Sequence, residues 1–401
     1  MRRVSLSTPV VLALAAGGLA WACTDVPIAP MAESRNGTES ITFWQNNPAV
    51  YWNGVARELV ATQRSPAPVA IRGYAIVAVA QYNAAVAAEK GKVQAMHPSV
   101  RAAIAAASVE ALAYLYPALE VSLRDHLEAY VSTTLLRSEL HTDIEAGSAI
   151  GRAVGAQVVA RAQGDAFFAP WTGTVPVGPG LWFSSSPPVG GGWGLARTYV
   201  LESADQFRPP PHPDFGSAAF LAALQEVRQF SDTRTAAQDA IAKFWDFPAG
   251  TYTPPGYWNE EGARLAVKYR LGARAAAHMF ALLHIVAYDG LVASHEAKYH
   301  YWLLRPTMAD PQITTAIVLP NFPSYPSNHA VVSGGMAAIL SALFPAERKR
   351  LEALAEEAAL SRVYGGIHYR FDGEAGLVLG RRIAAWALEQ DEPGREPFTL
   401  D

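Results

Sequence analysis

The 401-residue sequence has very little cysteine and little charge, and both shortages restrict what the protein can be. Its single cysteine, Cys23, excludes an intramolecular disulfide framework, a redox dithiol pair and a multi-cysteine zinc or iron–sulfur site. Lysine and arginine total 32 against 36 aspartate and glutamate residues, so there is no basic surplus to neutralise a nucleic-acid backbone. We therefore expect no nucleic-acid partner. Half of the residues are hydrophobic, which is typical of a chain with a large buried core.

The amino terminus has the pattern of an export signal. Two arginines precede an unbroken run of apolar residues and glycine over residues 10–20, which is too short to anchor the chain in a bilayer permanently. Ala20 and Ala22 then have the small-residue spacing that signal peptidases recognise. We expect residues 1–22 to be removed during export.

The residue that follows the expected cleavage point is Cys23, and its fate has two alternatives. Either the cysteine is lipidated, as in a bacterial lipoprotein, or it remains a free thiol. Residues 23–40 are polar and lack periodicity, so we expect a linker or tether there. The sequence thus predicts an exported protein, whether periplasmic, attached to the outer membrane or secreted, whose only membrane contact would be a lipid on Cys23.

The body of the chain has the periodicity of helices. Segments rich in alanine, with apolar residues at three- and four-residue spacing, recur throughout. These segments are residues 69–89, 100–116, 118–136, 144–163, 217–230, 260–302, 329–344, 346–364 and 373–389. Stretches that alternate apolar and polar residues are scarce, so we expect an all-α helical bundle. We assign residues 41–392 to one large domain and residues 393–401 to a tail.

Residues 164–214 interrupt this pattern with glycines, prolines and several large aromatic residues. A stretch of that length without regular structure in a compact protein is usually functional. Two interpretations remain open. The segment either lies over the bundle and helps to form the mouth of a pocket, or its aromatic residues only fix an insertion to the surface.

Residues 275–294 are apolar enough to raise the question of a transmembrane helix. Ionisable residues, among them His284 and Asp289, fall within the segment, and such groups are costly in lipid. We expect a buried helix of the bundle instead. No other segment of the mature chain is predicted to be long and apolar enough to span a membrane.

Three clusters of polar residues near the carboxyl end are suited to bind an anion. In the first, Lys298 and Arg305 lie seven residues apart, so a helix that continues through both places the two cations on one face. Pro306 then ends the helix and exposes that end. Two cations among aromatic residues are difficult to explain as a solvated surface alone.

The second cluster is the run PSYPSNH at residues 323–329, which leads into an apolar helix. Ser327 is predicted to cap that helix, whose first backbone N–H groups form an anion site. His329 then lies in the first turn, beside any anion held there. The alternative is an ordinary helix start whose histidine only packs.

The third cluster begins with Arg362, whose planar guanidinium suits a tetrahedral oxyanion. Gly365 and Gly366 are predicted to break the helix and to let the backbone approach closely. Asp372 follows His368 by four residues, a spacing that lets its carboxylate orient the ring and make the far nitrogen more basic. The three clusters together describe a site for a multiply charged tetrahedral anion.

The order of the clusters, written K-x6-R-P, P-S-x-H and S-R-x5-H-x3-D, resembles the three-part signature of the vanadium-dependent haloperoxidases and type-2 phosphatidic acid phosphatases. The resemblance covers residues 298–372. It extends more loosely to residues 254–259 (PPGYWN), which are similar to a stretch in secreted, soluble bacterial haloperoxidase-like members. It implies a helical bundle that holds vanadate as cofactor, with phosphate able to occupy the same site.

The resemblance also implies a role for each residue of the signature. The oxygens of vanadate or phosphate would be bound by Lys298, Arg305, Ser327, Arg362 and the backbone N–H of Asn328. His368 would bond to vanadium as the metal ligand, or attack phosphorus in a phosphatase, and Asp372 would orient its ring. His329 would be the acid–base partner on the opposite side.

Some positions depart from the family or leave its function open. The family usually has glycine where this chain has Asn328, whose side chain either crowds the anion or adds a hydrogen bond. Phe322, five residues before Ser327, matches an aromatic residue of chloroperoxidase members, where bromoperoxidases tend to carry histidine, but one residue does not fix the halide. We expect core or supporting roles for His295 and His300, which lie near the signature in sequence.

Three functions follow from these observations. The first is a haloperoxidase that uses hydrogen peroxide to oxidise a halide on bound vanadate. The second is an exported acid phosphatase that cleaves phosphate monoesters through a phosphohistidine on His368, and the third is a non-catalytic oxyanion-binding lipoprotein. The complete set of charged and acid–base residues argues against the third, and the PPGYWN-like stretch favours the first. The scarcity of membrane helices argues against an integral-membrane lipid phosphatase.

Overall fold

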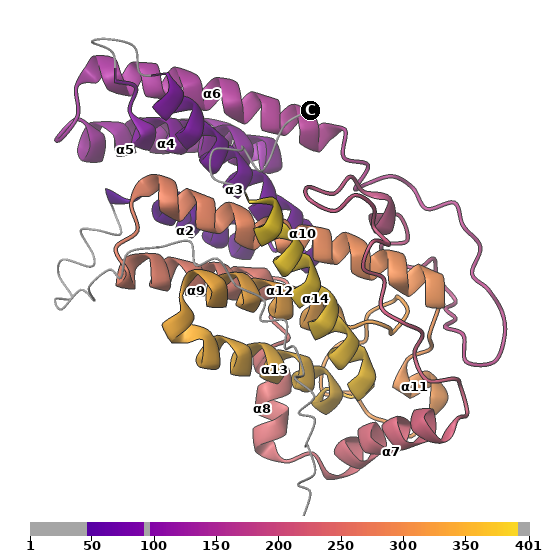
Figure 1. Ribbon diagram of the computed structural model, residues 1–401. Coiled ribbons are helices and arrows are strands. Elements are labelled where there is room, and N and C mark those ends of the chain that lie inside the picture. Colours follow the sequence, from indigo (N-terminus) through magenta and orange to yellow (C-terminus); the bar gives the residue numbers. More distant parts are fainter. Residues whose placement is uncertain (1–45, 92–96, 392–401) are drawn as a thin grey trace, which may run out of the picture. The chain divides into compact units, whose positions relative to one another are not determined.

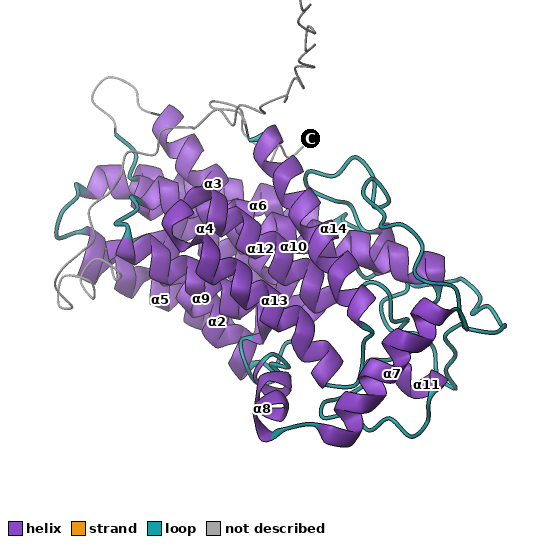
Figure 2. Ribbon diagram, turned by 60° about the horizontal axis from the view of Figure 1, so that its bottom comes forward, coloured by secondary structure: helices purple, strands orange, loops and turns teal. Residues whose placement is uncertain are grey.

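The computed structural model describes residues 46–91 and 97–391. The predicted signal, the linker with Cys23 and the tail at 393–401 lie outside the described residues. The structure is 68% helical and its described part contains no sheet, so the all-α prediction is confirmed (Figure 2).

The described part is built from helices joined by loops (Figure 1). The α-helices are α2 (Pro48–Thr62), α3 (Ala67–Lys90), α4 (Val100–Leu115), α5 (Glu120–Tyr130), α6 (His141–Gln163), α7 (Ala218–Thr233), α8 (Ala236–Phe244), α9 (Thr253–Lys268), α10 (Ala273–Tyr301), α11 (Pro306–Ala309), α12 (Asn328–Leu343), α13 (Arg348–Tyr364) and α14 (Arg370–Gln390). Four short helical segments are η1 (Pro117–Leu119), η2 (Val131–Leu135), η3 (Trp193–Leu195) and η4 (Pro345–Glu347).

The observed helices follow the predicted segments with two breaks that periodicity did not predict. The segment 260–302 is divided into α9 and α10, because Arg270 adopts a left-handed backbone (φ 52) and Gly272 begins the next helix. The segment 118–136 is divided into η1, α5 and the π-helical turn η2. Helices α2, α8 and α11 were not predicted.

Helix α10 lies in the core of the bundle and packs against α2, α3, α9, α12 and α14 (Figure 1). By length and composition α10 and α3 could each cross a membrane, but 89% of the apolar window of each is buried inside the protein. The segment 275–294 is therefore a buried part of α10, as expected. The sequence analysis did not identify α3 as a second helix that passes this test.

Helices α12 and α14 approach each other unusually closely, and glycine makes this possible. A Cβ atom added to Gly380 would lie 2.1 Å from the carbonyl oxygen of Val331, and one added to Gly376 would lie 2.7 Å from that of Ser327. No larger side chain fits between two backbones at such a distance. The contact holds the first turn of α14 beside the start of α12, where the backbone N–H of Ser327 donates to the carbonyl of Asp372 at 3.0 Å.

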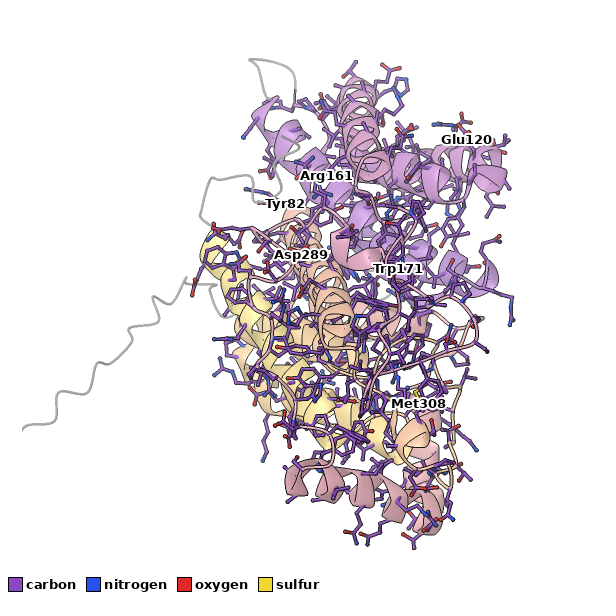
Figure 3. All side chains as sticks on the ribbon, turned by 90° about the vertical axis from the view of Figure 1, so that its right-hand side faces the viewer. Tyr82, Glu120, Arg161, Trp171, Asp289 and Met308 are labelled. Carbon is purple, nitrogen blue, oxygen red and sulfur yellow. The ribbon has the colours of Figure 1, made fainter. Side chains whose placement is uncertain are left out.

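The long loop at 164–214 is tied to α10 by a buried carboxylate. Asp289 accepts hydrogen bonds from the backbone N–H groups of Tyr199, Val200 and Leu201 at 2.8–3.0 Å. Arg161 on α6 adds a hydrogen bond to the carbonyl of Thr198 at 2.7 Å. Asp289 and Arg161 are both labelled in Figure 3. The loop is therefore fixed by ionic hydrogen bonds as well as by its aromatic residues.

The same loop also contacts the segment that follows α10. The N–H of Trp182 donates to the carbonyl of Trp302 at 2.6 Å, and the N–H of Leu304 donates to the carbonyl of Gly180 at 3.1 Å. This places the loop against the chain between Lys298 and Arg305. Its predicted part in a pocket mouth stays a prediction.

Asp289 generates a prediction about stability and pH. Burial raises the pKa of this carboxyl from 3.8 to about 6, although three N–H donors and Arg161 act in the opposite direction. The folded protein therefore keeps the proton to a higher pH than the unfolded chain does. As pH rises from about 4 to about 6, the free energy of unfolding should fall relative to that of Asp289→Asn, by about 1–3 kcal/mol.

Urea unfolding of both proteins across that pH range measures the difference. Asp214→Asn, which changes an exposed carboxylate of the same loop, serves as the control. A difference between the natural protein and Asp289→Asn that does not vary with pH would contradict the assignment.

Candidate anion-binding site

The three predicted clusters converge at the start of α12. Helix α10 brings Lys298, the segment before α11 brings Arg305, and α13 with its following turn brings Arg362 and His368. All four side chains are almost fully buried. The site therefore gathers cations and a histidine away from water, where their interactions with an anion are strongest.

Lys298 and Arg305 do not share one helical face, so that prediction was wrong. Trp302 adopts a left-handed backbone (φ 55) and ends α10 at Tyr301, before Arg305 is reached. The two cations instead meet at the ring of Phe322, where Nζ of Lys298 and Cζ of Arg305 each lie 5.1 Å from the ring centroid. The shared aromatic contact brings both charges to one place.

Lys298 holds the turn that precedes α12. Its ammonium donates three hydrogen bonds, to the carbonyls of Pro323 at 3.0 Å, Ser324 at 2.7 Å and Pro326 at 2.5 Å. All three protons of the ammonium are thereby used. Burial, with the nearby charge of Arg305, lowers the pKa of Lys298 well below its usual value. The three carbonyl acceptors nevertheless favour the charged ammonium, so Lys298 offers an anion positive charge without a free N–H.

Arg305 is the cation with a free donor. Its Nε donates to the carbonyl of Phe322 at 3.0 Å, and its Nη1 lies 2.8 Å from the carbonyl of Ile367 and 3.0 Å from Nε2 of His368. Its Nη2 is buried and has no hydrogen-bond partner. Burial lowers the pKa of Arg305 to about 10, so the guanidinium remains charged at neutral pH.

His368 and Asp372 form the predicted pair. Nδ1 of His368 lies 2.7 Å from Oδ2 of Asp372. The same carboxylate oxygen accepts from Oγ of Ser324 at 2.5 Å and from the N–H of Tyr369 at 3.1 Å. Tyr369 is the N-cap residue of α14 and Asp372 is its third residue, so the bond from the N–H of Tyr369 is one half of a capping box. This bond fixes Asp372 on the first turn of α14.

The protonation of the pair follows from its surroundings. Burial, followed by the charges of Arg305 and Lys298, lowers the pKa of His368 well below its usual value. Burial raises the pKa of Asp372 to about 6, so the carboxylate is ionised at neutral pH. A neutral His368 then donates its Nδ1–H to Asp372 and keeps a lone pair on Nε2, the nitrogen that faces Arg305.

Ser327 lies at the N-cap position of α12, as predicted, but its side chain makes no capping hydrogen bond. Its Oγ is buried without a partner, as is Oδ1 of Asn328. The first backbone N–H groups of a helix also lack intrahelical acceptors. The helix start therefore presents a free hydroxyl and backbone N–H groups, as an anion site requires.

Arg362 is held by α8 and the residues that follow it, which the sequence analysis did not identify. Its Nη2 donates to the carbonyl of Ala242 at 2.8 Å, and its Nη1 lies 3.5 Å from Oδ1 of Asp246. Burial lowers its pKa to about 10. The turn that carries the chain from Arg362 to His368 depends on Gly366, whose backbone is left-handed (φ 78), in agreement with the predicted helix break.

His329 also contacts the residues that follow α8. Its Nε2 lies 3.0 Å from the carbonyl of Trp245 and 3.4 Å from Nη1 of Arg362, which can only donate. The shorter contact, to the carbonyl, requires the proton on Nε2. Burial and the charge of Arg362 lower its pKa well below its usual value. His329 is therefore neutral, and its Nδ1 is the nitrogen available to take a proton.

The residues that the sequence analysis missed are of two kinds. Ser324 lies within the second predicted cluster, three residues before Ser327. The sequence around it does not indicate that its hydroxyl donates a hydrogen bond to Asp372. Trp245 and Asp246 lie more than 80 positions before His329, and only the fold brings them to the site.

The donors suit an oxyanion rather than a metal cation. In residues 46–91 and 97–391 no group of three or more His, Cys, Asp or Glu side chains is arranged to hold a metal ion. Three buried cations, the unpaired Nη2 of Arg305 and the unpaired hydroxyl of Ser327 converge instead. Vanadate and phosphate are both tetrahedral oxyanions, and these residues fit either.

Comparisons with known proteins show what the chain is similar to. Residues 277–393 match the PAP2 superfamily. The chain is 33% identical to the vanadium-dependent bromoperoxidase of Ascophyllum nodosum over a stretch that covers 18% of each protein. The chain thus spans only 18% of the length of that curated relative.

Two solved structures have the same fold. A bacterial vanadium-dependent iodoperoxidase is similar with a TM-score of 0.73 and 24% identity, over 86% of this chain and 96% of that one. The holo form of a bacterial vanadium-dependent chloroperoxidase gives a TM-score of 0.67 and 13% identity, over 83% and 95%. At these identities the likeness establishes the fold.

The contact between Asp372 and His368 generates a second prediction. Asp372→Asn keeps the shape of the side chain and removes the charge that makes Nε2 of His368 basic. We expect affinity for vanadate, measured by calorimetry, to fall about 10- to 100-fold. Asp246→Asn, which changes a carboxylate on the far side of Arg362, should have a smaller effect. Equal affinities of Asp372→Asn and the natural protein would show that the pair does not tune the site.

Proposed function

Because residues 277–393 belong to the PAP2 superfamily and the chain has the all-α fold of bacterial vanadium-dependent haloperoxidases, we propose that it is a vanadium-dependent haloperoxidase. Its substrates would be hydrogen peroxide and a halide. The observation that carries the proposal is the neutral His368, held by Asp372 with a lone pair directed into a cluster of buried cations.

Each residue of the site has a task in this proposal. Arg305 Nη2, Ser327 Oγ and the backbone N–H of Asn328 would bind the oxygens of vanadate. Lys298 and Arg362 would balance its charge, because each of their side-chain nitrogens already has a hydrogen-bond partner on the protein. Bound vanadate supplies a Lewis acid that activates hydrogen peroxide for attack by halide, without a change in metal oxidation state.

His368 would bind the vanadium through Nε2. That nitrogen now faces Nη1 of Arg305 at 3.0 Å, so loading requires the guanidinium to give up this contact. Arg305 loses little by the change, since the same Nη1 retains the carbonyl of Ile367. The carboxylate of Asp372 stays on Nδ1 and keeps the ring in the required tautomer.

His329 would move the proton of the peroxide. The carbonyl of Trp245 fixes its Nε2–H, which leaves Nδ1 with a lone pair. Because its pKa is lowered, the ring is neutral and able to accept a proton at neutral pH. The contact with Trp245 therefore selects the tautomer of a general base.

A second candidate is an acid phosphatase, which the match to the PAP2 superfamily and the nucleophilic Nε2 of His368 support. In this reaction Nε2 of His368 forms a bond to phosphorus while the bond to the ester oxygen breaks. His329 would have to be protonated to give that oxygen a proton. Water then attacks the phosphohistidine and releases phosphate.

The first experiment separates the two functions on phosphate-free protein. One sample receives orthovanadate, hydrogen peroxide, a halogen acceptor and chloride, bromide or iodide; the other receives a chromogenic phosphate monoester. We expect halogenation that depends on vanadate and that His368→Ala abolishes, because the vanadium ligand is lost. His300, for which the sequence analysis expected a core or supporting role, is exposed near the end of α10, so that expectation was wrong and His300→Ala should retain full activity. Ester hydrolysis that vanadate inhibits, without halogenation, would make the protein a phosphatase.

His329→Ala tests the division of work between the two histidines. Vanadate affinity should be unchanged, because His329 is not among the residues proposed to bind the anion. Turnover should fall by about 10²–10⁴-fold, the usual contribution of a general base. Calorimetry with vanadate and steady-state halogenation measure the two quantities separately. Complete loss of vanadate binding would contradict this role.

A further inference from the structure

His295 is a buried histidine on α10 to which the proposed mechanism gives no task. It lies one helical turn before Lys298, and its side chain is fully buried. Its Nδ1 lies 3.0 Å from the carbonyl oxygen of Leu291. A carbonyl only accepts hydrogen bonds, so Nδ1 carries the ring proton. The other nitrogen, Nε2, is buried and has no hydrogen-bond partner.

The ring of His295 is neutral. Burial and the charges of Lys298 and Arg305 lower its pKa to about 3. At neutral pH its Nε2 is therefore a lone pair that accepts a hydrogen bond and cannot donate one.

His295 borders the anion site. Its ring lies edge-on to Phe322, with centroids 5.5 Å apart, and Phe322 is the ring against which Lys298 and Arg305 both lie. On another side the ring contacts Trp193 of the long loop at 4.7 Å. His295 thus lies between Trp193 of the long loop and Phe322, the ring that Lys298 and Arg305 both contact.

An unpaired imidazole nitrogen does not by itself indicate a ligand, as His284 demonstrates. Its Nδ1 also lacks a partner, but its Nε2 bonds to Asn259 at 2.7 Å and its charged neighbour is Arg57. His284 belongs to a polar network inside the bundle. His295 differs because the cations that act on it are those of the anion site.

We propose that Nε2 of His295 accepts a hydrogen bond from the neutral O–H co-substrate that reacts at the anion site, and so positions it. The proposal deepens the proposed function and rests on it. In a haloperoxidase the co-substrate is hydrogen peroxide, and in the phosphatase alternative it is water. A lone pair repels a halide, so the chemistry of this nitrogen fits an O–H molecule and not the anion that the peroxidase oxidises.

The complementarity of the free groups supports this choice. The other unpaired side-chain atoms at the site are of both kinds: Nη2 of Arg305 and Oγ of Ser327 can donate to oxyanion oxygens, and Oδ1 of Asn328 and Oδ1 of Asp372 can accept. Those two acceptors lie at the start of α12 and on the carboxylate that holds His368, whereas Nε2 of His295 is on the ring that contacts Phe322. Hydrogen peroxide carries protons as well as lone pairs, and it therefore needs an acceptor. Nε2 of His295 supplies one beside the cations.

The test compares three variants of the full chain with the natural protein. His295→Phe keeps a ring and removes the acceptor, whereas His295→Gln retains an acceptor in the carbonyl oxygen of its amide. His300→Phe makes the same change at an exposed position of the same helix and is the control. Vanadate affinity, measured without peroxide, should be equal in all four proteins.

In the peroxidase assay we expect the KM for hydrogen peroxide to rise roughly tenfold in His295→Phe, as the loss of one hydrogen bond predicts. The KM for halide should be unchanged, and His295→Gln should restore part of the loss. Titration of the vanadate-loaded protein with peroxide in the absence of halide, followed by absorbance, gives a dissociation constant that should rise by the same factor. An unchanged peroxide constant in His295→Phe, or equal losses in the Phe and Gln variants, would overturn the proposal.

Failure of the proposed function is distinguishable from failure of this proposal. If the natural protein halogenates nothing but cleaves phosphate esters, the peroxidase assignment fails and water is the co-substrate. His295→Phe should then leave kcat/KM for the ester unchanged, because the phosphohistidine forms before water attacks. It should increase the fraction of phosphohistidine found after quenching during turnover, because attack by water is slower. Equal fractions in His295→Phe and the natural protein would overturn the role of His295 in that case.

Discussion

The close approach of α12 and α14 is the constraint on which the site depends. Glycines at 376 and 380 let the two backbones come within a distance that no side chain tolerates. That contact sets the start of α12 against the first turn of α14, so Ser327 and Asp372 are joined through the backbone. The hydroxyl of Ser327, which we propose to bind the anion, and the carboxylate of Asp372 thus have a fixed separation before any ligand arrives. Such preorganisation is what an electrostatic site requires.

The second property of the site is its excess of buried positive charge. Lys298, Arg305 and Arg362 are at most 1% exposed, and among the described residues the fully buried carboxylate beside them is Asp372. Burying unbalanced charge is costly. The protein limits the cost by surrounding the cations with carbonyl oxygens, as the three bonds of Lys298 illustrate. A carbonyl neutralises no charge, so in the proposed function the remaining imbalance would favour the uptake of an oxyanion.

The sequence predicted the all-α fold and the residues that gather at the site, but not how they are held. Periodicity found most long helices because apolar spacing is a local signal. It failed at the end of α10, where Trp302 adopts a left-handed backbone within contacts to Gly180 and Trp182 that are far away in sequence. The prediction that Lys298 and Arg305 share a helical face was wrong for that reason. The hydrogen bond from Arg362 to the carbonyl of Ala242 on α8 could not be predicted from the sequence either, because it depends only on tertiary structure.

Several residues that border the site lie outside the segment that matches the PAP2 superfamily. The residues proposed to hold and transform the anion lie within the matched segment 277–393, whereas Trp193, Ala242 and Trp245, which border them, lie before it. Ala242 and Trp245 hold Arg362 and His329 through backbone carbonyls, so substitution of their side chains leaves these hydrogen-bond acceptors in the chain. Two descendants of one ancestral chain could keep the same reactive centre and diverge in what reaches it. Differences in substrate selectivity between two such proteins would then lie before residue 277, outside the segment that the family match covers.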